Sequence, residues 1–245
     1  MELLKKLTEF DAPSSRERDL CEFIAKTSEE MGYEVNYDGL GSVIAHKKGN
    51  GKKLMLAAHV DEIGIIVNYI DDKGFIRFGA VGGLQVKELM MRRVRFSNGT
   101  IGVIACEGGV EKPEISKMFI DIGAKSKEDA EKLVTVGDTA VFTGDFALSG
   151  DNVISKALDD RAGCYILLKT MENVKESNND LYFVFTTQEE VGLRGAKTSA
   201  FKVMPHYAIA VDITGTGDTP EAPKMDVRMG EGCAIKVMDR SVMCN

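Results

Sequence analysis

The stretch that decides the fold is Leu54-Met-Leu-Ala-Ala58, which runs directly into His59-Val-Asp61-Glu62. Five consecutive apolar residues suit a strand inside a parallel β-sheet, because such a strand is covered on both faces. The polar residues that follow are able to bind a metal ion. The stretch therefore predicts a buried strand with a candidate metal ligand, His59, at its carboxyl end.

Two later stretches repeat this arrangement. The apolar run 181–187 ends at Gln188-Glu189-Glu190, and the run 207–211 ends at Asp212. In open α/β sheets, ligands bind beyond the carboxyl ends of the strands. We therefore predict three buried strands that bring His59, both glutamates and Asp212 to one crevice.

A fourth segment, Ala157-Leu-Asp159-Asp160-Arg161, precedes an apolar helix predicted over 162–170. Taken alone, paired aspartates before a helix are an ordinary N-cap, and charges after a strand are usually a solvated loop. The coincidence of acids and a histidine at several strand ends favours a hydrolytic site with two metal ions.

Such a site needs a bridging carboxylate, further ligands for each ion and a general base. His59 can bind one ion, and Asp61 lies on the same face of the strand end, where it can orient the imidazole. Asp159 can bridge two ions. Of the adjacent glutamates, one can bind metal while the other takes a proton from water. Asp212 can complete the ion that His59 holds.

Composition excludes several other functions. The net charge of −7 and the lack of a basic stripe argue against nucleic-acid binding. We expect neither a membrane span nor a signal segment, because the apolar runs are too short. The five cysteines are scattered and odd in number, which is typical of reduced thiols in a cytoplasmic protein.

The spacing of glycines and apolar residues changes along the chain and divides it into segments. We expect an N-terminal helix capped by Ser14 and ended by Gly32, then strands at 35–37 and 42–45. From 65 to 150, short strands at 75–78, 93–96 and 100–105 alternate with glycines, and one helix is expected at 127–133. Residues 1–64 and 151–245 are predicted to form one α/β domain that surrounds this β-rich insertion. A last strand is expected at 235–238. His46 and His206 are interpreted as surface residues.

Four motifs in this order resemble the M42 family of metalloaminopeptidases. They are Ala58-His59-Val-Asp61-Glu62-Ile-Gly64, Ala157-Leu-Asp159-Asp160-Arg161-Ala-Gly163, Thr187-Gln-Glu189-Glu190-Val-Gly192 and Val211-Asp212. Phe119-Ile-Asp121-Ile-Gly123-Ala is similar to the family's inserted domain. The resemblance extends along essentially the whole chain.

The resemblance implies the site roles. His59 and Asp212 would bind one ion, Glu190 the other, and Asp159 would bridge them. Glu189 would be the general base, with Asp61 orienting His59. The peptide bond between Asp159 and Asp160 is expected to be cis.

The resemblance also implies the fold, the cofactors and the partners. The fold would be α/β, with a mixed, mainly parallel sheet flanked by helices in a zinc-peptidase-like catalytic domain, and a β-rich dimerisation domain inserted at 65–150. The cofactors would be two Zn²⁺ or Co²⁺ ions per subunit, and the substrates would be short peptides. The protein would form a homo-oligomer, in which dimers assemble into a dodecamer.

One departure from the family pattern leaves alternatives open. The family's second histidine ligand lies in a C-terminal Arg-Tyr-x-His-type motif, and no such motif occurs before Asn245. We therefore expect a chain that stops partway through the catalytic domain. A catalytically impaired assembly subunit is one alternative to an aminopeptidase. A two-metal deacylase or carboxypeptidase is another.

Overall fold

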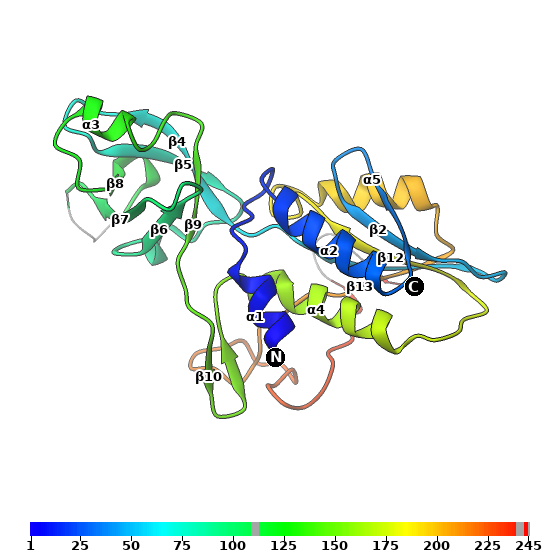
Figure 1. The fold of residues 1–245 in the computed structure, drawn as a ribbon. Helices are drawn as coiled ribbons and strands as arrows, with labels where there is room; N and C mark the ends of the chain where they lie inside the picture. The colour runs from blue at the N-terminus through cyan, green and yellow to red at the C-terminus, as the bar shows by residue number, and fades with distance from the viewer. Residues whose placement is uncertain (109–112, 239–242, 245) are drawn as a thin grey trace. The chain divides into compact units, whose positions relative to one another are not determined.

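The computed structural model describes residues 1–108, 113–238 and 243–244. Two compact units are distinguished, Met1–Asp212 and Ile213–Asn245. All named helices and strands lie in the first unit, which holds a five-stranded sheet, a closed barrel and a two-stranded hairpin (Figure 1).

The sheet is mixed, as predicted. Its strands are, in spatial order, β1 (Glu34–Tyr37), β2 (Val43–Lys47), β12 (Asp180–Thr186), β3 (Lys53–His59) and β13 (Tyr207–Ala210). The pairs β1–β2 and β2–β12 are antiparallel, whereas β3 pairs in parallel with β12 and with β13. The three strands with candidate ligands at their ends are thus neighbours that run in the same direction.

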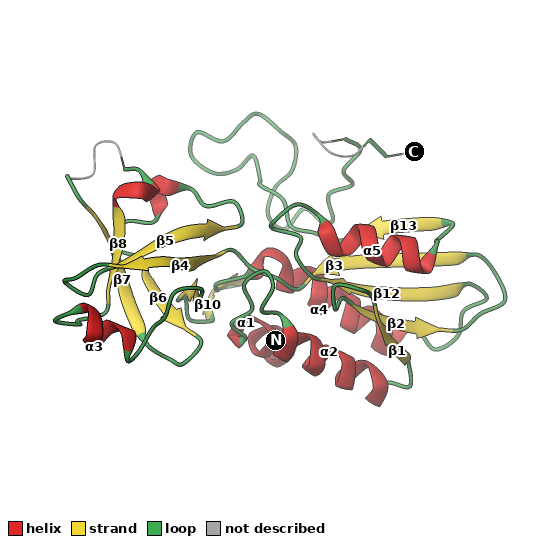
Figure 2. Ribbon diagram, turned by 90° about the horizontal axis from the view of Figure 1, so that it is seen from above, coloured by secondary structure: helices red, strands yellow, loops and turns green. Residues whose placement is uncertain are grey.

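Helices cover both faces of the sheet. On one face lie α1 (Glu2–Glu9), α2 (Arg18–Glu30) and α4 (Leu158–Asn173), and on the other lies α5 (Arg194–Val203) (Figure 2).

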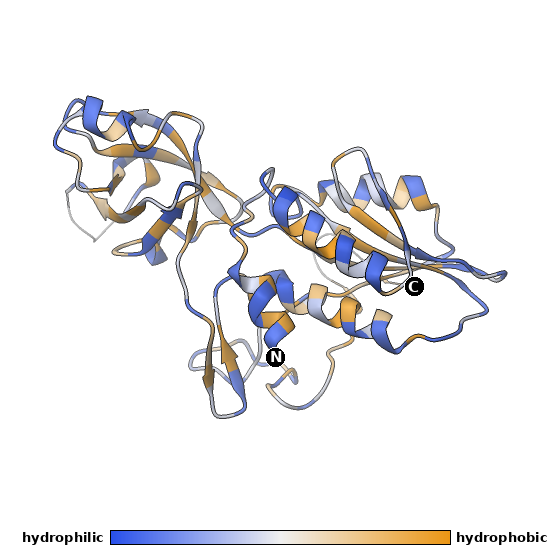
Figure 3. Ribbon diagram, viewed as in Figure 1, coloured by the Kyte–Doolittle hydropathy of each residue, from blue (hydrophilic) through white to orange (hydrophobic). Residues whose placement is uncertain are grey.

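The sheet is buried between these layers because side chains alternate along its strands. Phe183 and Phe185 of β12 pack in the core with α2 and α4, while Val184 packs with Val203 of α5. Both faces of the sheet are therefore apolar. Along α2, which packs on one of them, hydrophilic residues alternate with hydrophobic ones (Figure 3).

The chain from β3 continues into the barrel. Its strands are, in spatial order, β4 (Gly64–Ile70), β5 (Ile76–Val81), β8 (Met118–Asp121), β7 (Ile101–Cys106), β6 (Arg93–Phe96) and β9 (Thr139–Phe142). Isoleucines 65, 76, 104 and 120 are fully buried in its interior. Closure leaves no free strand edge, which suits short strands interrupted by glycines.

Short elements complete the first unit. They are the 3₁₀ helices η1 (Val86–Glu88) and η2 (Ile115–Lys117), the helix α3 (Lys127–Glu131), and the hairpin strands β10 (Ala147–Ser149) and β11 (Asn152–Ile154). The hydroxyl of Ser126 caps α3 by accepting a hydrogen bond from the Asp129 amide at 3.3 Å. The hairpin returns the chain from the barrel to α4.

The expected cap of the N-terminal helix is wrong. The helix α2 begins at Arg18 without a side-chain cap, and the expectation also missed α1. The hydroxyl of Ser14 instead donates to the carboxylate of Asp61 at 2.6 Å. The hydrogen bond from Ser14 to Asp61 is charge-assisted, because its acceptor is an ionised carboxylate. It is therefore stronger than the bond that the hydroxyl would form as a helix cap. Gly32 does follow the helix, with a φ of 85°.

Two strand expectations also need correction. The strand β13 is exposed rather than buried, with Tyr207 at 63% and Ile209 at 50%, because it is the outermost strand of the sheet. No strand forms over 235–238, where the described residues show only an isolated bridge between Met238 and Met243. No neighbouring strand pairs with that segment.

The interpretation of His46 as a surface residue is wrong as well. Its side chain is 17% exposed, stacks on Tyr182 and hydrogen-bonds Asp180 at 2.7 Å. The reason is that β2 is an interior strand between β1 and β12. His206 is exposed, as predicted, and its Nδ1 accepts from the Lys53 amide.

The second unit is made of turns and loops over residues 213–238 and 243–244. Its hydrogen bonds include one from the Gly217 amide to the Val227 carbonyl at 2.7 Å. Nowhere in the described ranges is a helix long and apolar enough to cross a bilayer.

Candidate metal centre

The parallel pairing of β3 with its neighbours brings the predicted residues to one edge of the sheet. His59 is in register with Thr186, the last residue of β12, so Glu189 and Glu190 follow only three and four residues later. On the other side, the Val211 amide donates to the Ala57 carbonyl at 2.8 Å, and Asp212 comes next.

Two groups of potential ligands share His59. The first is His59, Asp159 and Asp212, and the second is His59, Glu189 and Glu190. Within each group, one ligand atom from every residue lies within 4.8 Å of the others. All five residues named as ligands or base from the sequence therefore meet around one imidazole.

The hydrogen bonds of His59 select its tautomer. Its Nδ1 lies 3.0 Å from the backbone carbonyl oxygen of Asp61. A carbonyl oxygen can only accept, so Nδ1 carries the proton. The Nε2 atom lies 2.8 Å from Asp159 Oδ1 and donates to it when the ring is protonated, whereas in the neutral ring it presents a lone pair, which is the form that binds a metal.

Asp61 is fully buried, and it orients the loop after β12 as well as the imidazole of His59. Its carboxylate accepts hydrogen bonds from Ser14 Oγ at 2.6 Å, the Glu189 amide at 2.9 Å and the Glu190 amide at 3.1 Å. Its Oδ1 lies 3.5 Å from His59 Nδ1, so the main bond to the ring comes from the backbone carbonyl. Asp61 thus fixes the loop that presents both glutamates.

The adjacent residues Asp159 and Asp160 differ in burial and in their contacts. Their peptide bond is cis, as expected, and both residues leave helical geometry at the start of α4. The side chain of Asp159 is 53% exposed beside His59. Asp160 is fully buried, and its carboxylate accepts from the amides of His59 at 3.2 Å and Gly163 at 2.9 Å.

The cluster carries an excess of negative charge. Burial, reinforced by the charge of Asp212, raises the pKa of Asp160 to about 8, against the opposing effect of His59. Burial and the charge of Asp159 raise the pKa of Glu190 to about 7. Burial would lower the pKa of His59, but hydrogen bonds to Asp159 and Asp61 outweigh it and raise that pKa to about 11.

All three raised pKa values mean that the cluster binds protons readily. A metal cation would neutralise the same carboxylates in place of protons. Imidazole nitrogen and carboxylate oxygen are also the donors that zinc and similar divalent ions accept. The donor set and its electrostatics therefore fit a divalent metal ion.

A cavity of about 650 Å³ adjoins the cluster, and Asp159 and Glu190 form part of its wall. Apolar side chains line much of the rest: Ile63, Leu84, Leu89, Phe142, Ile154 and Leu158. Gly82 lies against Glu190, and a Cβ atom at Gly82 would come within 3.1 Å of the Glu190 Cβ. The cavity therefore lies directly beside two of the candidate ligands.

Sequence reasoning missed several residues that contribute to the site. Glu62 and Arg161 sit inside the quoted motifs beside candidate ligands, which was a signal that could have been followed. Ser14 gave no signal, because its partner Asp61 is 47 residues away. Lys156, three residues before Asp159, binds Glu62 at 2.7 Å.

Comparison with known proteins agrees on one family. The sequence profile described as M42 glutamyl aminopeptidase matches residues 41–245. A relative from Acetivibrio thermocellus, whose name assigns it provisionally to the aminopeptidases, is 53% identical over all of this chain and 75% of its own length.

Solved structures agree with the profile. An aminopeptidase from Desulfurococcus kamchatkensis superposes with a TM-score of 0.90 at 41% identity, covering 96% of this chain and 69% of the other. The Pyrococcus horikoshii TET1 peptidase, described as able to assemble into a tetrahedron or a large octahedral shell, has a TM-score of 0.79 at 34% identity, covering 89% and 72%.

Proposed function

The chain belongs to the M42 glutamyl aminopeptidase family, and on that premise we propose that the cluster around His59 is the metal centre of an aminopeptidase. The observation that carries the proposal is the pair of ligand groups sharing His59, one completed by Asp159 and Asp212 and the other by Glu189 and Glu190. The imidazole has one free lone pair, so His59 can bind a single ion, and a second ion would need Asp159 as a bridge to Glu190.

We assign the ligands as follows. His59 and Asp212 would hold one ion, Glu190 would hold the other, and Asp159 would contribute to both. The exposure of Asp159 supports a bridging role, because its carboxylate is open on the cavity side. We propose Zn²⁺ or Co²⁺, since a set of one imidazole and several carboxylates accepts either.

When bound, the metal pair would lower the pKa of water toward about 7 and polarise the scissile carbonyl group. Glu189 would take one proton from the water as the water oxygen bonds to the scissile carbonyl carbon, and would pass that proton to the amine nitrogen as the peptide C–N bond breaks. Burial raises the pKa of Glu189, which makes its carboxylate a better base. Asp61 keeps His59 and the Glu189 amide in place during this transfer.

The proposed substrates are short peptides with a free N-terminus. Six carboxyl groups and one imidazole make the centre strongly acidic: Asp61, Asp159, Asp160, Glu189, Glu190 and Asp212. Carboxylates of this set that do not bind the ions could contact a positively charged α-ammonium group of the substrate. The family match favours an aminopeptidase over a carboxypeptidase, because two bound divalent ions would offset most of the carboxylate charge.

We further propose a division of the chain and a setting for it. Residues 1–64 and 151–245 would belong to the catalytic domain, and 65–150 to a dimerisation domain built on the barrel. A homo-oligomer is supported by the assembly described for the TET1 peptidase. Five free cysteines support a reducing compartment, the cytoplasm.

The test is release of N-terminal residues from matched free and N-acetylated peptides by the purified chain with Co²⁺ or Zn²⁺. We expect cleavage of the free peptides only, and loss of cleavage with chelator or in Glu189→Gln. The matched control is Glu172→Gln, which removes an exposed carboxylate paired with Lys169. Equal cleavage of acetylated peptides would indicate a deacylase or endopeptidase instead. No cleavage of any peptide would reject a self-sufficient aminopeptidase.

A further inference from the structure

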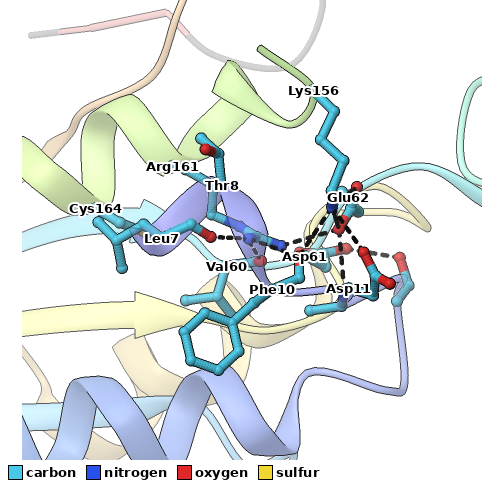
Figure 4. Close-up of polar contacts among 12 residues, drawn as sticks. Leu7, Thr8, Phe10, Asp11, Val60, Asp61, Glu62, Lys156, Arg161 and Cys164 are labelled. Atoms are coloured by element: carbon cyan, nitrogen blue, oxygen red, sulfur yellow. Dashed lines mark hydrogen bonds and ion pairs between the residues drawn. The ribbon is translucent and has the colours of Figure 1, made fainter. Parts of the chain in front are cut away.

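Arg161 is the largest fully buried side chain in the described chain, and it directly follows the Asp159–Asp160 bend. Its guanidinium group reaches two other segments (Figure 4). Nε donates to the Val60 carbonyl at 2.9 Å, and Nη2 donates to Glu62 Oε1 at 3.3 Å. Nη1 donates to the Leu7 carbonyl at 2.5 Å.

Lys156 adds a second positive charge beside Glu62, and the carboxylate of Asp11, 3.2 Å from the Lys156 ammonium group, balances it. Its ammonium group lies 2.7 Å and 2.9 Å from the two carboxylate oxygens of Glu62, and it also donates to the Phe10 carbonyl at 2.9 Å. Glu62 accepts a further bond from the Ala12 amide at 3.0 Å. The side chains of Lys156 and Glu62 are 6% and 5% exposed, so both charges are satisfied inside the protein.

These contacts flank the candidate ligands on both sides. Val60 and Glu62 are the chain neighbours of Asp61, whose carbonyl oxygen holds His59 Nδ1. Lys156 and Arg161 stand three residues before and two residues after Asp159. The cluster therefore ties the loop that follows His59 to the bend that carries Asp159.

The chemistry of this cluster suits positioning. A buried ion pair contributes little net stability compared with apolar packing, because both ions lose their hydration. A guanidinium group, however, offers several donors in a rigid plane, and so fixes the acceptors around it in direction as well as distance. A lysine at the same place would keep the charge and lose that fork.

We propose that Arg161, together with Glu62 and Lys156, is a positioning group that holds His59 and Asp159 at metal-binding distance. This inference rests on the proposed function, since it takes those two residues as ligands. None of the three positioning side chains is assigned as a ligand. They act through Val60, Asp61 and the bend at Asp159.

The experiment is a titration of the metal-free chain with Co²⁺ alone, followed by the visible absorption of the bound ion, which reports coordination geometry. The variants are Arg161→Lys and Glu62→Gln. The matched control is Asp180→Asn, which removes a carboxylate from the half-buried cluster with His46 and Tyr182 at the opposite end of β12. Thermal unfolding is measured for every variant.

We expect the two test variants to bind Co²⁺ about 10- to 100-fold more weakly, with a changed absorption spectrum, as partners that orient ligands typically do. Asp180→Asn should lose stability and keep wild-type affinity and spectrum. If Arg161→Lys fails to fold, Glu62→Gln decides, because it keeps the shape of the side chain. Wild-type affinity and spectrum in the folded test variants would overturn the inference alone. A wild-type chain that binds no Co²⁺ would overturn the proposed metal centre as well.

Discussion

The carboxylate of Asp61 accepts a hydrogen bond from the backbone amide of Glu190 at 3.1 Å, across 129 residues of sequence. The loop after β3 and the loop after β12 are thereby joined at one buried charge. Because the Glu189 amide binds the same carboxylate, the two glutamates are presented toward His59 by backbone contacts that do not depend on their own side chains.

Replacing Asp61 with Asn should therefore reduce turnover strongly. The amide has one acceptor oxygen where the carboxylate has two, so at least one of the three donors that face Asp61 loses its partner. A buried donor left without a partner costs about 1–3 kcal/mol. We expect kcat/KM to fall about 10- to 100-fold, as for other groups that orient metal ligands. Steady-state kinetics and urea unfolding measure the two effects, and unchanged kinetics would reject the orienting role.

Gly163 should tolerate no side chain. A Cβ atom there would lie 2.4 Å from both carboxylate oxygens of Asp160. In an open helix, Gly→Ala stabilises by up to about 1 kcal/mol, but here we expect overpacking to cost about 1–3 kcal/mol. Displacing Asp160 would also release the His59 amide, so metal affinity should fall.

The control for this prediction is Gly39→Ala, at a glycine with no atom within 4 Å of the added Cβ. Chemical denaturation and Co²⁺ binding are compared for both variants. Equal stability of the two would show that the helix start relaxes around the methyl group.

The strands and the site could be predicted from the sequence wherever a local pattern was sufficient. The run 54–58 and the polar residues after it indicated both β3 and a candidate metal ligand, His59, because burial and strand-end position are local properties. The exposure of β13 could not be predicted, since the apolar run 207–211 looks like an interior strand. Only the order of strands in the sheet shows that it lies at the edge.

Partners distant in sequence were likewise beyond local reasoning. Ser14 resembles a helix cap, and only the folded chain brings it to Asp61. His46 beside two lysines resembles a surface residue, whereas its neighbour in space is Tyr182. In both cases a long-range contact between strands or loops overrode a reasonable local interpretation.

Asp38 should make the protein sensitive to acid. Burial alone would raise its pKa, but hydrogen bonds from Ser199, Thr198 and the amides of Leu40 and Ser42 outweigh burial and lower the pKa below 3.8. A lowered folded-state pKa gives stability that is present above the unfolded-state pKa and lost as pH falls through the folded one.

Asp38→Asn should therefore destabilise the protein by about 2 kcal/mol at pH 6, because bonds to a charged acceptor are lost. As the pH falls well below 3.8, Asp38 itself becomes protonated and the difference should shrink. Urea unfolding at pH 6 and at acidic pH measures it, with Asp19→Asn, at an exposed carboxylate in the first turn of α2, as the control. A constant difference across this range would contradict the assignment.

Metal removal should destabilise the folded chain, and this effect should depend on the Asp159 carboxylate as a ligand. Free metal at about 100 times its Kd stabilises a protein that binds it only when folded by about 2.7 kcal/mol. Binding should be strong here because burial and the charge of Asp159 raise the pKa of Glu190, and a cation would supply the positive charge that this carboxylate lacks. Thermal unfolding with Co²⁺ or with chelator measures the effect. Asp159→Asn should abolish the metal-dependent part, whereas Asp121→Asn, at an exposed carboxylate on the barrel, should retain it. Equal metal stabilisation of both variants would place the bound ion away from His59.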